Sequence, residues 1–268
     1  MNFKNKNVLI TGGASGIGKI MARKCLERDV KNVVIWDLNE NGLNAFKSQF
    51  PESANKIHLY KANISSLEEI KNTAEKVRTE VGKIDLVINN AGIVVGKYFH
   101  EHSHEDISNT LVINSAAAMH ISLEFLPAMI KENSGAICNI ASSAGLIANP
   151  KMSVYAASKW AVNGWSESLR LEMKQLNYDI SITTIMPFFI NTGMFDGVKS
   201  KLLPILEPEK TAERIMKAIE NKTKILAMPL PYWFIRFSQG LLPLSAFDWV
   251  MENIFGIYDT MKNFKGRN

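Results

Sequence analysis

Short apolar runs alternate with longer amphipathic stretches along most of the chain. The apolar runs are unbroken, which is typical of β-strands that helices cover on both faces. They predict strands at residues 8–10, 33–36, 57–60, 86–88, 136–140, 180–185 and 225–228. Helical periodicity predicts helices at residues 16–27, 39–49, 66–81, 105–131, 153–176 and 208–222. This alternation indicates an α/β fold, a doubly wound parallel sheet with helices on both faces.

Two predicted helices are preceded by the sequence of a capping box. Ser65-Ser66-Leu67-Glu68 and Ser103-His104-Glu105-Asp106 each place a serine three residues before a carboxylate. Such a pair satisfies free backbone N–H groups at a helix N-terminus. We therefore expect a helix to begin inside each segment.

Composition and charge narrow the classes of function. The 268 residues are 46% hydrophobic and 21% charged, which suits one domain with a large core. The net charge of +5 comes from dispersed lysines, so no nucleic-acid partner is expected. Cys25 and Cys138 fall in a predicted helix and strand, so we expect buried thiols in a reducing, cytoplasmic location. His100, His102 and His104 fit no zinc spacing, and no metal is expected.

No signal peptide and no membrane-spanning helix are expected either. The first strand begins near Asn7, which leaves no room for a signal peptide before it. The most apolar stretch, residues 225–235, is shorter than the roughly 20 residues that cross a bilayer.

A glycine-rich turn joins the first predicted strand to the first predicted helix. Its sequence is Thr11-Gly12-Gly13-Ala14-Ser15-Gly16-Ile17-Gly18. Glycines at this place let the backbone approach a pyrophosphate, whose charge the N–H groups of the helix N-terminus meet. The strand–turn–helix unit is typical of a Rossmann-type fold, although the spacing G-x-x-x-G-x-G differs from the commoner G-x-G-x-x-G. A tight structural turn is the alternative.

Asp37 ends the second predicted strand. A carboxylate there accepts hydrogen bonds from the adenosine ribose and repels a 2′-phosphate. Neither Leu38 nor Ser15 supplies a cation for that phosphate, so NAD is favoured over NADP as cofactor. The alternative is an aspartate that only caps the next turn. After the fourth strand, small and amide residues are expected to line the same cleft: Asn90, Ala91 and Gly92.

Three residues in the second half of the chain suit proton transfer. Tyr155 and Lys159 lie one helical turn apart on the same face of a predicted helix. A free tyrosine has a pKa near ~10, and a nearby ammonium favours the phenolate, so Tyr155 can exchange a proton with a substrate oxygen. Ser142 follows the fifth strand and is expected to hydrogen-bond that oxygen. By itself, the Tyr155/Lys159 pair is also common on helix surfaces.

Together with the glycine turn, Asn114, Asn139-Ile140-Ala141-Ser142 and Tyr155…Lys159 resemble the short-chain dehydrogenase/reductase family over about residues 5 to 195. The resemblance implies that Tyr155 is the catalytic acid/base and that Ser142 orients the substrate. It implies that Lys159 binds the nicotinamide ribose and that Asn114 holds a water of a proton relay. Phe188 departs from the family pattern, which has glycine there. The resemblance extends the cofactor contacts, which are then Gly12, Ser15, Gly16, Ile17, Gly18, Asp37, Asn63, Ile64, Asn90, Ala91, Gly92, Tyr155, Lys159, Pro187, Ile190 and Thr192.

Further stretches resemble the branch with retinol dehydrogenases and lipid-droplet 17-beta-hydroxysteroid dehydrogenases. They are Trp36-Asp37-Leu38-Asn39, Phe125-Leu126-Pro127-Ala128-Met129, Thr192-Gly193-Met194-Phe195, Leu206-Glu207-Pro208-Glu209 and the tail Asn263-Phe264-Lys265-Gly266-Arg267. The N-terminal membrane or lipid-droplet anchor that is usual in those relatives is not expected here. The family often assembles through its fourth and fifth helices, which implies a homodimer or homotetramer.

We assign residues 1–228 to a dinucleotide-binding and catalytic Rossmann domain and residues 229–268 to an apolar C-terminal appendage of the same domain. Aromatic residues of the appendage, among them Trp233, Phe237 and Trp249, allow three interpretations. They complete the core or a subunit interface, they roof an apolar substrate pocket, or they contact a membrane or lipid surface.

The sequence therefore predicts an NAD(P)(H)-dependent oxidoreductase that interconverts an alcohol and a carbonyl on a lipophilic substrate such as a retinoid, steroid or fatty alcohol. NAD is the expected cofactor. A dehydrogenase of a small polar alcohol is one alternative. A non-catalytic nucleotide-sensing or scaffold protein is the alternative of another class.

Overall fold

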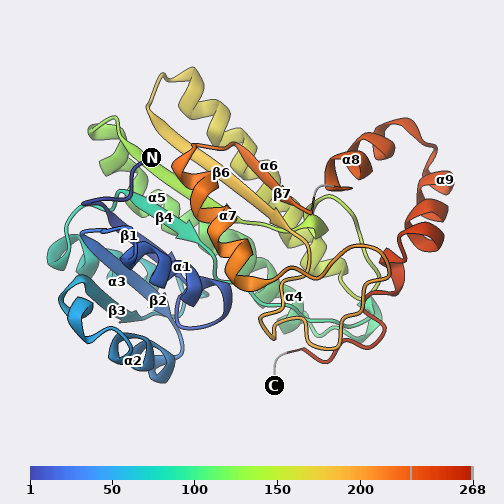
Figure 1. The fold of residues 1–268 in the computed structure, drawn as a ribbon, viewed down its shortest axis with the longest axis horizontal. Helices are drawn as coiled ribbons and strands as arrows, with labels where there is room; N and C mark the ends of the chain where they lie inside the picture. The colour runs from blue at the N-terminus through green and yellow to red at the C-terminus, as the bar shows by residue number, and fades with distance from the viewer. Residues whose placement is uncertain (230, 267–268) are drawn as a thin grey trace.

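Seven parallel strands form one sheet in the order β3-β2-β1-β4-β5-β6-β7 (Figure 1). The computed structural model describes residues 1–229 and 231–266, so Arg267 of the tail lies outside the described residues. The predicted doubly wound α/β fold is confirmed. The strands are β1 (Asn7–Thr11), β2 (Asn32–Asp37), β3 (Ile57–Lys61), β4 (Leu86–Asn89), β5 (Gly135–Ile140), β6 (Ile180–Pro187) and β7 (Ile225–Met228).

Helices cover both faces of this sheet. They are α1 (Gly16–Leu26), α2 (Glu40–Ser48), α3 (Leu67–Glu80), α4 (His104–Leu111), α5 (Ala117–Lys131), α6 (Ser153–Gln175), α7 (Pro208–Glu220), α8 (Pro231–Leu241) and α9 (Leu244–Trp249). Successive strand residues point to opposite faces, so Val8 and Ile10 pack with α1, α2 and α7 whereas Leu9 packs with α3, α5 and α6. The unbroken apolar runs of the sequence follow from this two-sided burial.

The strand order reverses direction between β1 and β4. The chain first builds outward through β2 and β3, and then returns to the other side of β1 through β4 to β7. Loops after β1 and β4 therefore diverge and leave a crevice at the carboxyl ends of these strands, where ligands bind in doubly wound folds.

One predicted helix is interrupted. Residues 105–131 contain α4, a π-helical turn η3 (Val112–Ala116) and α5. By length and composition alone, His104–Lys131 is apolar enough to cross a membrane. Its buried side chains, among them Ile121 and Phe125, pack on the sheet with β4 and β5, which explains its apolar character.

The capping boxes differ in outcome. At α4 the box forms: Ser103 Oγ accepts the Asp106 N–H at 3.0 Å, and Asp106 accepts the Ser103 N–H at 3.1 Å. At α3 the prediction is wrong by one residue, because Ser66 caps the helix by accepting the Glu69 N–H. The Glu69 carboxylate instead accepts the Asn63 N–H at 2.8 Å, which fixes the loop after β3.

The C-terminal appendage extends beyond the end of the sheet. Figure 1 shows α8 and α9 standing away from the sheet at the right, with the chain returning beneath them. Buried side chains of the appendage join the core cluster: Ile235 of α8, Phe247 of α9, and Met251, Ile257 and Met261 of the segment that follows α9. Elsewhere, Cys25 and Cys138 are buried free thiols as expected, and burial raises the pKa of both.

Candidate active site

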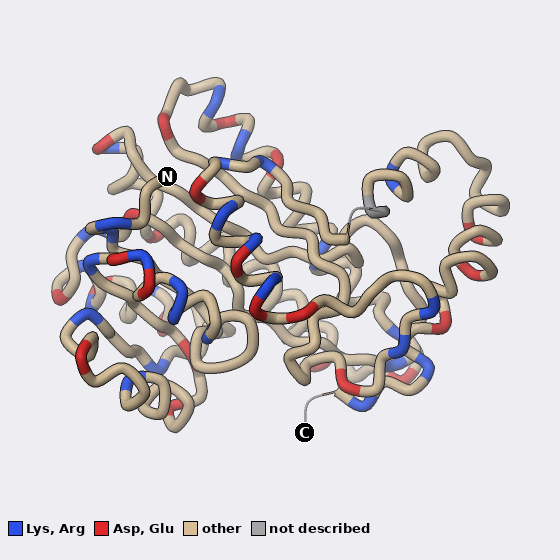
Figure 2. Tube along the Cα trace, viewed as in Figure 1, with Lys and Arg blue, Asp and Glu red and all other residues tan. Residues whose placement is uncertain are grey.

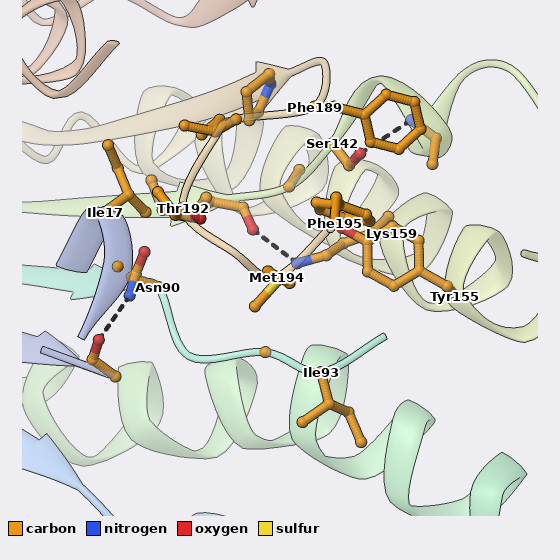
Figure 3. A pocket seen from close by; sticks show the side chains of 18 of the residues that line it. Ile17, Asn90, Ile93, Ser142, Tyr155, Lys159, Phe189, Thr192, Met194 and Phe195 are labelled. Atoms are coloured by element: carbon orange, nitrogen blue, oxygen red, sulfur yellow. Dashed lines mark hydrogen bonds between the residues drawn. The ribbon is translucent and has the colours of Figure 1, made fainter. Parts of the chain in front are cut away.

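A cleft of about 330 Å³ lies at the carboxyl ends of the strands (Figure 3). Loops after β1, β4, β5 and β6 line it, together with α6 and α8. Of the site residues predicted from the sequence, only Gly18 and Asn114 do not line it. The remaining ones come together although they are far apart in the sequence, because parallel strands end at the same edge of the sheet.

The glycine turn lies against the loop after β4. Gly12 has a φ of +66°, and a Cβ there would lie 2.9 Å from the Ala91 Cα. A Cβ on Gly18 would lie 2.2 Å from the Gly12 carbonyl oxygen, so this glycine lets α1 approach the turn and makes no cofactor wall. The first turn of α1 carries no acidic residue. Its N–H groups thus suit a pyrophosphate, and the cleft fits a dinucleotide.

Asn90 and Thr11 hold this turn in shape. The Asn90 Nδ2 donates to the carbonyl oxygens of Thr11 at 3.0 Å and Gly12 at 3.1 Å. In return, Thr11 Oγ1 accepts the N–H groups of Asn90 and Ala91, both at 3.1 Å. Asn90 lines the cleft, but both N–H groups of its side-chain amide are used by these bonds to the turn. This role of Thr11 was not predicted from the sequence, in which the only indication was its position at the end of the first strand.

One end of the cleft, where the sequence predicts the adenosine, is formed by the ends of β2 and β3. Asp37 accepts the Ala14 N–H at 3.0 Å on one carboxylate oxygen and the Asn39 N–H at 2.9 Å on the other. Asp37 therefore caps the turn, which was the alternative interpretation of this residue, and it also lines the cleft. Asn63 Oδ1 accepts both the N–H and the hydroxyl of Ser65, which leaves the Asn63 Nδ2 donor for a ligand.

The three side chains that the sequence predicts to react are buried in the cleft. Tyr155 and Lys159 lie on α6 and Ser142 follows β5, with exposed fractions of 5%, 4% and 8%. Lys159 Nζ donates to the Ile140 carbonyl oxygen at 2.9 Å and lies 5.7 Å from the centre of the Tyr155 ring. Ser142 Oγ accepts the Ala144 N–H at 3.1 Å. These bonds fix the two side chains beside Tyr155, as Figure 3 shows.

Burial is the largest cause of the pKa shifts of Tyr155 and Lys159. It raises the pKa of Tyr155 to about 12, while a hydrogen bond with Ser142 acts in the lowering direction. Burial also lowers the pKa of Lys159 to about 8. The expectation that Lys159 holds the pKa of Tyr155 below its ordinary value is therefore wrong in this structure. Loss of hydration by the phenolate outweighs the lowering effect of the Ser142 hydrogen bond, and Lys159 is not among the groups that shift this pKa.

Asn114 lies in the π-helical turn η3, behind the cleft. Its Oδ1 accepts the Ile93 N–H at 2.8 Å, and its Nδ2 donates to the Ile93 carbonyl oxygen at 2.9 Å. The same Nδ2 lies 3.0 Å from Ser158 Oγ on α6. Asn114 therefore ties the loop after β4 to the helix that carries Tyr155. Its role in a water relay stays a prediction.

Known proteins match the sequence along almost its full length. A model of the short chain dehydrogenase family matches residues 6–202. Epidermal retinol dehydrogenase 2 of Mus musculus is 35% identical over 271 residues, 99% of this chain and 87% of that protein. Human estradiol 17-beta-dehydrogenase 11 is 32% identical over 259 residues, 96% and 86% of the two chains. A short-chain dehydrogenase/reductase of Burkholderia phymatum in complex with NAD has a TM-score of 0.81 at 22% identity, over 90% of this chain and 95% of that one.

The chain belongs to the short-chain dehydrogenase/reductase family. This is a family of oxidoreductases that bind a nicotinamide cofactor, and the predicted family and branch are confirmed. Among the described residues, no group of three or more His, Cys, Asp or Glu side chains is arranged to hold a metal ion.

An aromatic wall of this dehydrogenase was missed in the sequence. Phe188, Phe189 and Phe195 follow β6 and line the cleft, and Phe195 meets the Tyr155 ring edge-on at 6.0 Å between centroids. Phe188 stands where the family usually has glycine, and its ring packs on Phe189 at 4.5 Å. In the sequence, the only indication of this wall was the closeness of the three phenylalanines to one another.

The roof of the cleft also differs from expectation. Ile235 of α8 is 1% exposed and lines the cleft, whereas Trp233 and Phe237 are 46% and 65% exposed and do not. Trp249 of α9 is 59% exposed. The proposal that these three aromatic residues roof the pocket is therefore wrong, because α8 turns its smaller apolar side chain inward.

Proposed function

We propose that this protein is an NAD-dependent dehydrogenase that interconverts an alcohol and a carbonyl on a lipophilic substrate. The observation that carries this proposal is the burial of Ser142, Tyr155 and Lys159 between the glycine-turn end of the cleft and an apolar end. Proton transfer and hydride transfer need these groups to meet at one substrate carbon and its oxygen.

In this proposal the side chains handle the substrate oxygen. The Ser142 hydroxyl hydrogen-bonds that oxygen and fixes its distance from the Tyr155 hydroxyl. During reduction the neutral phenol of Tyr155 donates its proton to the oxygen, and during oxidation the phenolate accepts the alcohol proton. The nicotinamide ring of the cofactor supplies or accepts the hydride. Lys159 holds the nicotinamide ribose next to Tyr155, which is a role inferred from the family.

NAD is favoured over NADP by the charges at the adenosine end. Asp37 places a carboxylate there, and Leu38 beside it is 63% exposed and uncharged. Within the described part of the chain, Lys159 is the only lysine or arginine that lines the cleft, and it lies beside Tyr155. A 2′-phosphate would therefore meet a negative charge without a cation among the described residues that line this end of the cleft.

A lipophilic substrate is favoured by the walls beyond Tyr155. They include apolar side chains from four segments: Ile147 after β5, Phe189, Phe195 and Leu203 between β6 and α7, Ile235 of α8 and Ile257 near the C-terminus. Apart from the oxygen that Ser142 and Tyr155 bind, further hydroxyl groups of a small polar alcohol would face these apolar side chains and would lose hydration. The two named relatives, a retinol dehydrogenase and an estradiol dehydrogenase, support the same substrate class.

Turnover of an alcohol panel tests the proposal. Retinol, a steroid alcohol and long-chain fatty alcohols are compared with ethanol and glycerol, each with NAD and NADP, by following absorbance of the reduced cofactor. Each CH₂ buried against the wall contributes about 0.8 kcal/mol, so long alcohols should exceed short ones by at least about tenfold in kcat/KM. Faster turnover of the polar alcohols would support the polar-alcohol alternative. Cofactor binding without turnover of any alcohol would support the sensor or scaffold alternative.

The outer face of α8 and α9 supports contact with a lipid surface. Trp233, Phe234, Phe237, Leu241 and Leu244 are exposed there. Figure 2 shows few charged residues on these two helices, and Arg236 lies 6.0 Å from the centre of the Trp233 ring. Aromatic and aliphatic side chains beside an isolated cation suit the boundary between lipid headgroups and acyl chains. We infer that this face lies on the membrane or droplet that holds the substrate.

A homodimer or homotetramer is inferred from the family. Exposed apolar side chains on α5 and α6, Leu123 at 64% and Trp160 at 49%, support an interface through these helices. Sedimentation of the protein in the absence of lipid measures the assembly, and a monomer at micromolar concentration would contradict it.

A further inference from the structure

The C-terminal tail runs back over the substrate end of the cleft. It follows the short helix η6 (Ile257–Asp259) and is held to the loop between β6 and α7 by backbone hydrogen bonds. Lys265 N–H donates to the Asp196 carbonyl oxygen at 2.9 Å, and Lys199 N–H donates to the Thr260 carbonyl oxygen at 3.4 Å. Met261 is 1% exposed, so the tail is packed into the fold.

Two loops are shaped to admit this tail. A Cβ on Gly197 would lie 2.1 Å from the Asn263 carbonyl oxygen, and Gly197 has a φ of +82°. A Cβ on Gly96, in the loop after β4, would lie 2.2 Å from Cδ1 of Phe264. Any larger residue at either position would displace the tail. The loops after β4 and β6 therefore both contact the segment around Phe264.

A third attachment joins the tail to the loop after β5. Asn149 Nδ2 donates to Thr260 Oγ1 at 2.8 Å, and both residues are buried. Asn149 itself lines the cleft near Ile147. The tail thus connects the loops after β4, β5 and β6, which form the substrate end. Helices separate these three loops from one another in the sequence.

Phe264 reaches the reacting tyrosine through a chain of rings. Phe264 does not line the cleft, but its ring centre lies 6.5 Å from that of Phe195. Phe195 lines the cleft and contacts Phe189 at 4.9 Å and Tyr155 at 6.0 Å between ring centres. Phe195 is therefore packed between the tail behind it and the catalytic tyrosine in front.

We propose that the C-terminal tail is a latch in which Phe264 holds Phe195 against Tyr155 and so positions the apolar part of the substrate. The inference rests on the proposed function, because it concerns the substrate end of the same site. Phe264 is a positioning residue that acts through Phe195. Without the Phe264 ring, Phe195 loses its support and the loop after β6 loosens over the apolar end, while the glycine turn and Asp37 are untouched.

Kinetics of Phe264→Ala test the latch. The KM for a long-chain alcohol should rise about tenfold, whereas kcat and the Kd for NADH should each change less than about twofold. Phe264→Leu, which keeps an apolar side chain against Phe195, should restore most of the lost affinity. Phe99→Ala is the matched control, because Phe99 is 65% exposed and does not line the cleft. A KM for Phe264→Ala equal to that of the control would overturn the latch, as would an equal loss of kcat and NADH affinity.

Two further measurements keep the proposal testable if that variant folds poorly or the proposed substrate is wrong. A double-mutant cycle of Phe264→Leu with Phe195→Leu should show non-additive changes in KM, because the two rings act as one unit. Hydrogen exchange without any substrate should be at least about tenfold faster at amides 195–203 in Phe264→Leu than in the wild type. Additive kinetics or unchanged exchange would refute the latch. Failure of wild-type turnover on lipophilic alcohols, with faster exchange in the variant, would refute only the proposed function.

Discussion

Replacing Asp37 with asparagine should shift the cofactor preference from NAD toward NADP. The Asp37 carboxylate accepts the N–H groups of Ala14 and Asn39. Asparagine has nearly the same shape but only one acceptor oxygen, so the variant removes the charge and one of the two hydrogen bonds and keeps the other. Alanine would remove both bonds, so a change in cofactor binding could come either from the lost charge or from damage to the glycine turn.

The expected magnitude follows from Coulomb's law. Two unit charges about 4 Å apart repel by about 1 kcal/mol in water and about 4 kcal/mol at the effective dielectric constant near a protein surface. Since the cleft is open to solvent, we expect about 1 to 2 kcal/mol, or about fivefold to thirtyfold in the cofactor ratio. The lost bond to the turn costs about 1.5 to 3 kcal/mol, but it weakens both cofactors and leaves their ratio unchanged.

The assay is the ratio of kcat/KM for NADP to that for NAD with one alcohol. Asp37→Asn should raise this ratio by at least about fivefold over the wild type. Asp179→Asn is the control, because the exposed Asp179 pairs with Lys222 away from the cleft. A ratio that moves less than about twofold would refute the electrostatic reasoning. A wild-type enzyme that already prefers NADP would refute the choice of cofactor.

Three other outcomes are expected. Tyr155→Phe should lower kcat by at least about 100-fold with NADH binding unchanged in a fluorescence titration, and retention of more than a few per cent of the rate would contradict the role of Tyr155. Because burial raises the pKa of Tyr155 to about 12, alcohol oxidation, which needs the phenolate, should speed up as pH rises throughout the range in which the protein stays folded. Carbonyl reduction, which needs the neutral phenol, should stay flat over that range, and the opposite pattern in stopped-flow rates would be inconsistent with this titration. Trp233→Ala should weaken binding to liposomes in a flotation assay and leave kinetics with soluble alcohols unchanged, since Trp233 does not line the cleft; a selective rise in KM would restore it as a pocket residue.

The strands could be predicted from the sequence because their burial is two-sided. Every residue of β1 and β4 is buried, so the apolar runs are unbroken and unmistakable. The interruption between α4 and α5 could not be predicted in this way. The helical pattern continues through Val112–Ala116, and Asn114 in the π-helical turn bonds to Ile93 and Ser158. Those partners lie on other elements, so only the folded chain brings them together.

Most of the predicted site residues lie together in the cleft, because strand ends and helix N-termini fix their positions. Gly12, Asp37 and Tyr155 all occupy such places. The titration of Tyr155 could not be predicted, since the spacing to Lys159 says nothing of hydration and burial dominates. The aromatic wall was missed for a related reason. Phe195 and Phe264 are 69 positions apart in the printed sequence and meet only through loop packing.

The same contrast distinguishes the residues that we propose to bind the cofactor from those that we propose to bind the substrate. The proposed cofactor end is built largely by backbone, with Gly12 and the N-terminus of α1 at the expected pyrophosphate position, so it depends on local sequence. The substrate end is built by side chains such as Phe195 and Ile235, which loops and helices from distant parts of the chain deliver. Changes at Asp37 should therefore alter cofactor choice with the substrate range intact. Changes at Phe195 or Ile235 should alter the substrate range with the cofactor unchanged, because the two ends share only the proton-transfer residues between them.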